Sequence, residues 1–270
     1  MAFYNTAFHG LLESIPFDIE MTGVGKFSAR EGIVSISNCN IEQFCRTFDL
    51  KKHSRLKRLD LMHNRVSLED LNVIAERCTT LQEFGCTVTF QSLPERLPLL
   101  LKLPVRSIST SFVDKNVCEL IKRSKIEALT VSEFDDELTR VLIDANCVRD
   151  LQVSFMPESC FPALAQFLKT TTSLTSLDLY SDFDPSLLEV LPVSLTSLTI
   201  CPGQTNICMG VGVTEIVAIL KKHKLIRFRC ANFRQPLTEK DGTEICVAIL
   251  NCPSLRSVGL SFPLSEQTVR

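Results

Sequence analysis

The sequence has no excess of charge of either sign and no long hydrophobic run. Its 29 basic and 31 acidic residues leave a formal net charge of −2, so no overall field attracts nucleic acid or an anionic membrane. Two basic clusters, at 51–58 and 221–227, are more typical of solvated helix ends and turns. The densest apolar stretch, LPLLLKLP at 97–104, is far shorter than the roughly 20 residues that a bilayer requires. We therefore expect neither a nucleic-acid partner nor a membrane partner.

Signals for export are also missing. The first residues, MAFYNTAFHGLLESIPFDIE, do not place a basic region before a continuous apolar one, as a secretory signal would. No Asn precedes Ser or Thr at the glycosylation spacing. These features predict an intracellular, cytoplasmic chain.

Catalytic and metal-binding patterns are scarce. Nucleophilic sites need a nearby histidine, and the sequence has four, none within a catalytic motif: His9, His53, His63 and His223. There is no CxxC or HxxxH pair, and the glycines at 22–28 and 209–215 lack the phosphate-binding spacing. The sequence therefore predicts a protein that is not an enzyme and that needs no cofactor and no metal.

The sequence does contain an internal repeat, with apolar residues at positions 1, 4 and 6. In the clearest copy, LKRLDLMHNRV, Leu56, Leu59 and Leu61 occupy these positions and Asn64 occupies position 9. The pattern starts at residues 31, 56, 81, 105, 126, 148, 174, 195, 225 and 255, with a mean period of about 25. Since side chains alternate along a strand, positions 4 and 6 are predicted to point into one core.

The segments between these copies show apolar residues at helical spacing. They are 67–78, 113–124, 135–146, 162–170, 214–222 and 238–250. Ser67 precedes Asp70 by three residues, as in a capping box, and Asp135 or Asp136 can cap the helix predicted at 135–146.

Ten copies of this pattern make the chain similar to leucine-rich-repeat proteins over about residues 31–262. The resemblance implies an α/β solenoid of about ten repeats, with a curved parallel sheet inside and helices and turns outside. Residues 1–30 would form an N-terminal cap or partial repeat, and residues 31–270 the leucine-rich-repeat domain. Cys78 and Cys252, three residues before position 1, resemble the cysteine-containing subtype common in substrate receptors of ubiquitin ligases, although residues 1–30 match no F-box.

Six of the twelve cysteines have a place in the repeat. Position 9, position 6 or the helix-to-strand turn accounts for Cys39, Cys86, Cys230, Cys78, Cys147 and Cys252. We interpret them as small buried apolar groups rather than disulfides or metal ligands.

A binding surface is predicted on the concave face, where positions 3, 5, 7 and 8 point outward. Position 5 is mostly small and polar, while large side chains stand at positions 7 and 8, where aromatic groups favour an interface. The predicted partner-binding residues are Met62, His63, Phe112, Glu133, Phe155, Asp178, Tyr180, Arg227, Arg229 and Phe262. The alternative is that about half of the large side chains pack within the protein.

The resulting interpretation is a protein–protein interaction scaffold or adaptor whose partner is not identified. The alternatives are a substrate-recognition subunit of a ubiquitin-ligase-type complex, a GTPase-activating leucine-rich-repeat protein and an RNA-binding protein.

A solenoid must cover both ends, and little sequence follows the last predicted strand. We expect a partner, a second copy or further residues to cover that end.

Overall fold

The computed structural model describes residues 19–21, 25–27, 57–61, 66–89, 93–132, 134–154, 157–180, 184–201, 211–231 and 238–261. They belong to two compact units, residues 1–128 (unit 1) and 129–270 (unit 2). Within the predicted cap, β1 (Ile19–Met21) and β2 (Gly25–Phe27) pair antiparallel as a small separate sheet. The first predicted repeat, at residue 31, lies outside the described residues. The predicted domain boundary at 30/31 stays a prediction.

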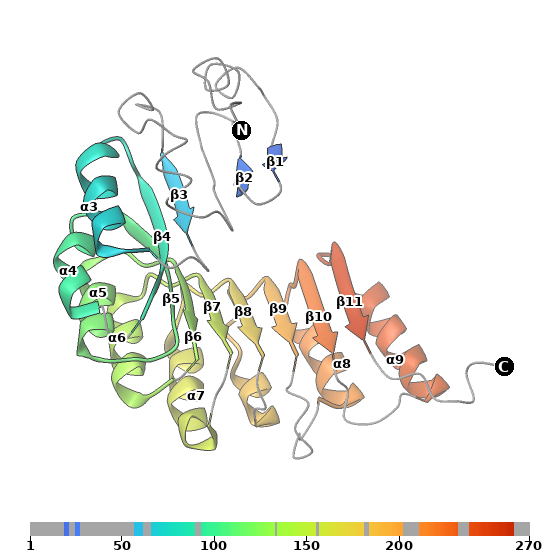
Figure 1. Cartoon of the computed structure of the whole chain (residues 1–270). Helices are drawn as coiled ribbons and strands as arrows, with labels where there is room; N and C mark the ends of the chain where they lie inside the picture. Colours follow the sequence, from blue (N-terminus) through green and yellow to red (C-terminus); the bar gives the residue numbers. More distant parts are fainter. Residues whose placement is uncertain are drawn as a thin grey trace. The chain divides into compact units, whose positions relative to one another are not determined.

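The main sheet is parallel, and its nine strands follow one another in sequence order (Figure 1). The strands are β3 (Arg58–Leu61), β4 (Glu83–Val88), β5 (Val105–Thr110), β6 (Ala128–Val131), β7 (Asp150–Val153), β8 (Ser176–Leu179), β9 (Ser197–Ile200), β10 (Arg227–Ala231) and β11 (Ser257–Ser261). Each coincides with one of the nine remaining predicted repeats. The α/β class and the alternation of parallel strands with helices are therefore confirmed.

Successive repeats are joined by the same backbone hydrogen bonds. The carbonyl of Thr175, at position 2, accepts from the amides of Thr196 and Ser197 in the next repeat. The carbonyl of Thr196 in turn accepts from Ile226 and Arg227. The carbonyls of Lys57, Arg149 and Ile226, also at position 2, each accept from two successive amides of the next repeat in the same way. Since the same position recurs in each bond, the repeats are equivalent structural units.

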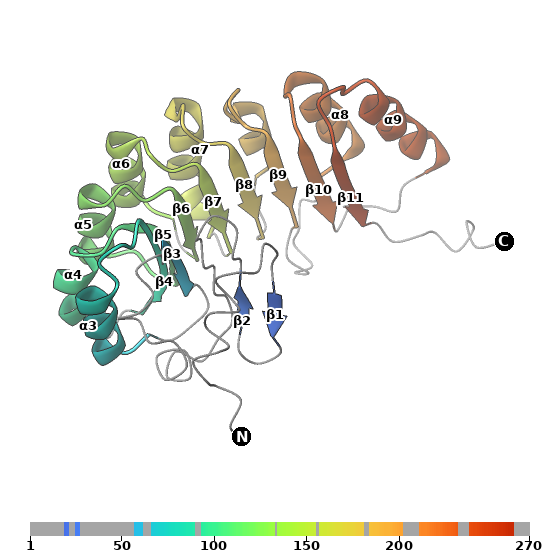
Figure 2. The same ribbon diagram turned by 90° about the horizontal axis from the view of Figure 1, so that it is seen from above.

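Helices and short 3₁₀ segments connect the strands. They are α3 (Leu68–Arg77), α4 (Leu93–Leu100), α5 (Lys115–Arg123), α6 (Asp136–Ala145), η3 (Glu158–Cys160), α7 (Phe161–Thr170), η4 (Pro185–Val190), α8 (Val213–Lys222) and α9 (Glu239–Leu250). In unit 2 the helices lie on one face of the strands (Figure 2). None of the helices that the structure describes in unit 2 covers the other face of its strands, called the open face below.

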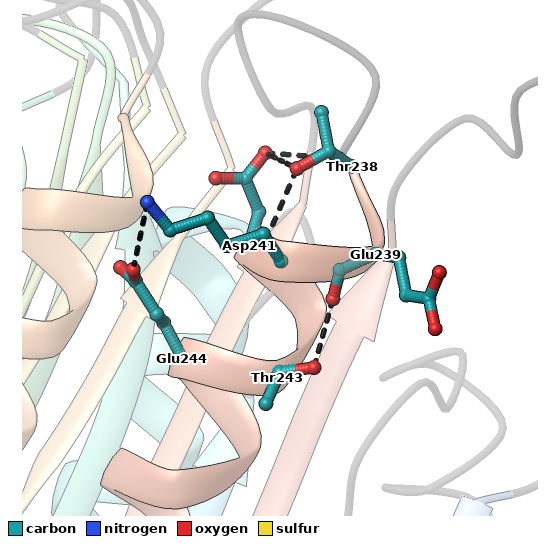
Figure 3. Close-up of polar contacts among 6 residues, drawn as sticks. Thr238, Glu239, Asp241, Thr243 and Glu244 are labelled. Carbon is teal, nitrogen blue, oxygen red and sulfur yellow. Dashed lines mark hydrogen bonds and ion pairs between the residues drawn. The ribbon is translucent and has the colours of Figure 1, made fainter.

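Local sequence sets where several helices begin. Ser67 and Thr238 each form a capping box, with Asp70 and Asp241 respectively. Figure 3 shows the start of α9, where the Thr238 hydroxyl donates to Asp241 over 2.7 Å and the Thr243 hydroxyl donates to the Glu239 carbonyl over 2.9 Å. The side chain of Asp135 accepts from the Leu138 amide and caps α6. The capping predictions at Ser67 and Asp135 are thus confirmed.

Helix α4 was not predicted from the sequence. Its segment contains Pro98, and a proline within a helix removes a hydrogen bond and is costly. Leu93 and Leu100, at its two ends, are fully buried. Their burial offsets the unfavourable proline, which a local reading of the sequence could not anticipate.

Positions 4 and 6 form the core as predicted. From β3 to β10 every side chain at these positions is buried, including Leu59, Leu129 and Leu177. Thr110 takes position 6 of β5 and is 3% exposed. The exception is β11, where Val258 is 40% exposed and Leu260 is half-buried. Two large side chains of α9, Val247 and Leu250, are exposed as well. The last repeat, formed by α9 and β11, is therefore less covered than the others.

The described cysteines are all free thiols. Those predicted at position 6, Cys86 and Cys230, are buried, as are Cys78 and Cys252, whereas Cys147 is half-buried. Burial raises the pKa of both Cys86 and Cys230 to about 12.

Among the helices described here, none has the length and apolar character needed to cross a membrane.

Candidate binding site on the open face of the sheet

The strands of unit 2 align equivalent positions into rows on the open face. The register pairs position 3 of β8, β9, β10 and β11 in one row: Ser176, Ser197, Arg227 and Ser257. Position 5 forms the second row: Asp178, Thr199, Arg229 and Gly259. Since side chains alternate, these two rows point away from the helices, while positions 4 and 6 point towards them.

The two rows surround a hollow of about 340 Å³, called the basin below. Its wall includes Tyr180, at position 7 of its repeat, together with atoms of Leu198, Phe228 and Val258. The Tyr180 amide donates to the Val153 carbonyl over 2.9 Å, which fixes the backbone at this rim. The basin therefore belongs to four consecutive repeats and lies wholly within unit 2.

The basin carries two guanidinium groups from one strand. Arg227 and Arg229 are both exposed, and neither is in an ion pair with any residue that the structure describes. They are two residues apart on the same face of β10, so their Cα atoms are about 6.6 Å apart at the usual rise of a parallel strand. Both charges are thus available to a bound molecule.

Hydroxyl groups lie beside the two arginines. Ser197 and Ser257 pair with Arg227 on the neighbouring strands, and Thr199 pairs with Arg229. Within the described parts of the chain, these three side chains make no hydrogen bond. They can therefore donate to a bound molecule at no cost to an internal bond.

Arg229 has room to extend because the neighbouring residue is glycine. A Cβ atom built on Gly259 would lie 3.4 Å from both Cγ and Nε of Arg229. The arginine side chain therefore lies against the backbone of β11. Asp178 is in the same row but two strands away on the other side, so it does not hold the guanidinium.

Charges at the rim influence two ionisable groups. The pKa of Tyr180 is raised, first by burial and then by the negative charge of Asp178, while Arg229 lowers it. The pKa of the Cys201 thiol is also raised by burial, against the opposing effect of Arg229. A thiol with a raised pKa is mostly protonated at neutral pH, so Cys201 adds no negative charge beside Arg229.

Four of the predicted partner-binding residues come together in this basin: Asp178, Tyr180, Arg227 and Arg229. Phe112 lies in unit 1, follows β5 and is half-buried. Its amide donates to the Thr110 hydroxyl over 3.3 Å, and its carbonyl accepts from that hydroxyl over 2.8 Å. These bonds fix the backbone of Phe112 beside Thr110, and its role as an anchor stays a prediction. The other predicted residues, Met62, His63, Glu133, Phe155 and Phe262, lie outside the described residues.

The serines of the basin were not among the predicted binding residues. Ser176, Ser197 and Ser257 occupy position 3, which was expected to face outward, but only positions 5, 7 and 8 were compared between repeats. Listing position 3 in the same way would have placed these serines on both sides of Arg227. The direction of Arg229 towards Gly259 had no signal in the sequence.

The sequence matches no protein-family model and no curated protein. Among the residues placed by the structure, no group of histidine, cysteine and acidic side chains could hold a metal ion.

Proposed function

We propose that this chain is a leucine-rich-repeat adaptor that binds a partner protein in the basin of its open face and catalyses no reaction. The observation that carries the proposal is the basin itself. On one surface it brings together an exposed tyrosine with two arginines and several hydroxyl groups that have no partner among the residues the structure describes. Arginine and tyrosine are enriched among residues that dominate binding energy at protein interfaces.

The leucine-rich assignment is supported by spacing and by burial together. The pattern of positions 1, 4 and 6 was drawn from sequence alone, and strands occur at each described copy. The backbone hydrogen bonds at position 2 repeat with the same period. A repeat period of 20–29 residues with one strand per unit is typical of this family.

A cytoplasmic location is part of the proposal and rests on the sequence signals described above. No contact among the described residues favours a ubiquitin-ligase or GTPase-activating role, and both stay predictions. Binding at the basin is compatible with any assembly that needs a rigid recognition surface.

The proposal can be tested by selecting peptides against the purified full-length chain. A random peptide library is displayed, binders are enriched, and each is measured against two variants with the same bulky substitution. Thr199→Trp fills the floor of the basin, because Thr199 is half-buried on the open face. Gln166→Trp is the matched control, because Gln166 is exposed on α7, on the opposite face.

We expect enriched peptides to lose at least about tenfold in affinity with Thr199→Trp and to keep it with Gln166→Trp. Circular dichroism and thermal unfolding verify that both variants fold. Binders that tolerate Thr199→Trp would place the binding surface elsewhere and overturn the proposal.

A further inference from the structure

We propose that the basin selects an extended peptide whose side chains carry oxyanions two residues apart, supplied by Asp and Glu carboxylates or by phosphoserine. This inference deepens the proposed function and rests on it. Carboxylates and phosphates share the relevant chemistry, because both are acceptors that arginine binds in a bidentate geometry.

Charge is the first argument. The basin holds two guanidinium groups against one carboxylate, that of Asp178. Arg229 lies against Gly259, on the side away from Asp178, so the carboxylate does not neutralise it. The half of the basin formed by β10 and β11 is therefore positive, although the whole chain has a net charge of −2.

Spacing is the second argument. Arg227 and Arg229 are separated by one residue on a single strand, and both face the basin. In an extended peptide, side chains two residues apart point to the same side and are separated by about 6.6 Å. A peptide lying along β10 would thus set two acidic side chains opposite the two arginines, whereas adjacent acidic residues would point to opposite sides.

The hydroxyl groups are the third argument. An oxyanion held by one arginine still has unpaired acceptor sites, and leaving these without donors is unfavourable once water is excluded. Ser197 and Ser257 lie on the strands that flank Arg227, and Thr199 is beside Arg229. Each hydroxyl can donate to the remaining oxygens. The basin is therefore rich in donors, which suits anions better than neutral peptides.

The same phosphate chemistry occurs in RNA, but the basin suits a peptide better. Proteins that bind single-stranded nucleic acid stack the bases on aromatic side chains. Tyr180 is the exposed aromatic residue of the basin, because the ring of Phe228 is 1% exposed and belongs to the core. One ring at one rim gives no series of stacking platforms for successive bases.

The experiment uses the full chain and two synthetic libraries of peptides of equal length. One contains unmodified residues only, and the other carries a fixed phosphoserine. Enriched sequences are resynthesised and titrated against the wild type and two double variants. Arg227→Gln with Arg229→Gln removes two charges from the basin. Lys169→Gln with Lys221→Gln removes two exposed charges from α7 and α8 and is the matched control.

The expected result is enrichment of Asp and Glu at alternate positions, or of peptides from the phosphoserine library. Their dissociation constants should rise about tenfold or more in the arginine variant and less than about twofold in the lysine variant. Raising the salt from about 50 mM to about 300 mM should weaken binding, since exposed charges are screened. The two libraries show whether carboxylates or phosphate are preferred.

Several outcomes would overturn the inference, and they separate it from the proposed function. Peptides that fail to bind Thr199→Trp but bind the arginine variant normally would leave the basin as the binding surface and refute the anionic ligand. Enrichment of neutral or basic peptides would also refute the anionic ligand. An unrelated single-stranded RNA that binds more tightly than every peptide, and that depends on the arginines, would assign the basin to nucleic acid instead. Peptides that bind Thr199→Trp normally would refute the proposed function itself.

Discussion

The side chain of Arg229 lies against the backbone of Gly259 on the neighbouring strand. A Cβ atom at Gly259 would be 3.4 Å from two atoms of the arginine, which is an ordinary contact, so a side chain longer than a methyl group would be needed to displace the arginine. Gly85 has the same relationship to Asp60, since its Cβ atom would be 2.9 Å from the Asp60 carboxylate. At both places a glycine at position 5 gives space to a charged residue of the preceding repeat.

This relationship makes Gly259 a determinant of ligand binding. We predict that Gly259→Glu pairs with Arg229 and thereby competes with an anionic peptide, so the affinity falls about tenfold or more. Gly259→Ala should change the affinity less than about twofold, because a methyl group makes only a close contact with the arginine. Titration with an acidic peptide from the selected pool measures both. Equal affinities for the two variants would show that Arg229 does not depend on this space.

The ionisation of Tyr180 should report on the charges around the basin. Asp178 raises the pKa of Tyr180 and Arg229 lowers it. We therefore predict that Asp178→Asn lowers the pKa of Tyr180 and that Arg229→Gln raises it further. Absorbance of the phenolate during a pH titration measures the change. The sequence has two tyrosines, so the experiment uses Tyr4→Phe as its background.

A change in the same direction for both variants would contradict this prediction, because the two side chains carry opposite charges. Lys169→Gln removes a positive charge from the opposite face of unit 2 and serves as the control. It should leave the titration of Tyr180 unchanged.

His223 should make the stability of unit 2 depend on pH. Its side chain is 3% exposed, and neither ring nitrogen has a hydrogen-bond partner within the described part of the chain. Burial, and then the charge of Lys222, lower the pKa of His223 from its ordinary value of 6.5. The folded protein thus binds this proton less readily than the unfolded chain. Stability should be fully present above pH 6.5 and should fall as the pH drops below that value, by at most about 1.4 kcal/mol per pH unit.

His223→Leu removes the titrating group and keeps a similar volume. We predict that the free energy of unfolding of this variant, measured in urea, changes less between neutral and mildly acidic pH than that of the wild type. The other three histidines are present in both proteins, so the difference isolates His223. Parallel curves would mean that this imidazole does not contribute to the acid sensitivity.

Asn146 ends α6 in the left-handed conformation, with a φ of 40°. Residues other than Gly and Asn adopt this conformation at a cost of about 1 to 2 kcal/mol. We predict that Asn146→Ala is less stable than Asn146→Gly by about 1 kcal/mol. Both variants lose the hydrogen bond that the side-chain amide of Asn146 donates to the Thr172 hydroxyl. The difference between their free energies of unfolding therefore measures the cost of the backbone conformation. Urea unfolding of the pair tests the prediction, and equal stability would refute it.

Much of the fold followed from the sequence because burial repeats with a fixed period. Leu59, Leu129 and Leu177 were expected to point into the core, and each is almost fully buried. Helix α4 was not anticipated, because the cost of Pro98 is local whereas the burial of Leu93 and Leu100 depends on neighbouring repeats. Periodicity therefore predicts which face a residue occupies. It does not predict when burial against a neighbouring repeat stabilises a segment whose own sequence disfavours a helix.

The site was predictable only in part, for a similar reason. The outward direction of Asp178, Arg227 and Arg229 followed from the alternation of side chains. Their assembly into one basin depends on the register between strands, which pairs Asp178 with Thr199 and Thr199 with Arg229. The direction of a long, exposed arginine side chain depends on the space left by its neighbour, and no pattern within one repeat contains that information.

The uneven covering of β11 links ligand binding to the stability of the end of unit 2. In a chain of repeats, each unit is stabilised mainly by its neighbours, and β11 and α9 leave Val258, Val247 and Leu250 exposed. This last repeat should unfold locally before the inner repeats, and its backbone amides should exchange fastest with deuterated solvent. Since Ser257 and Gly259 belong to the basin, a molecule bound there would slow that exchange. Protection at β11 would then provide a measure of occupancy that needs no label on the ligand.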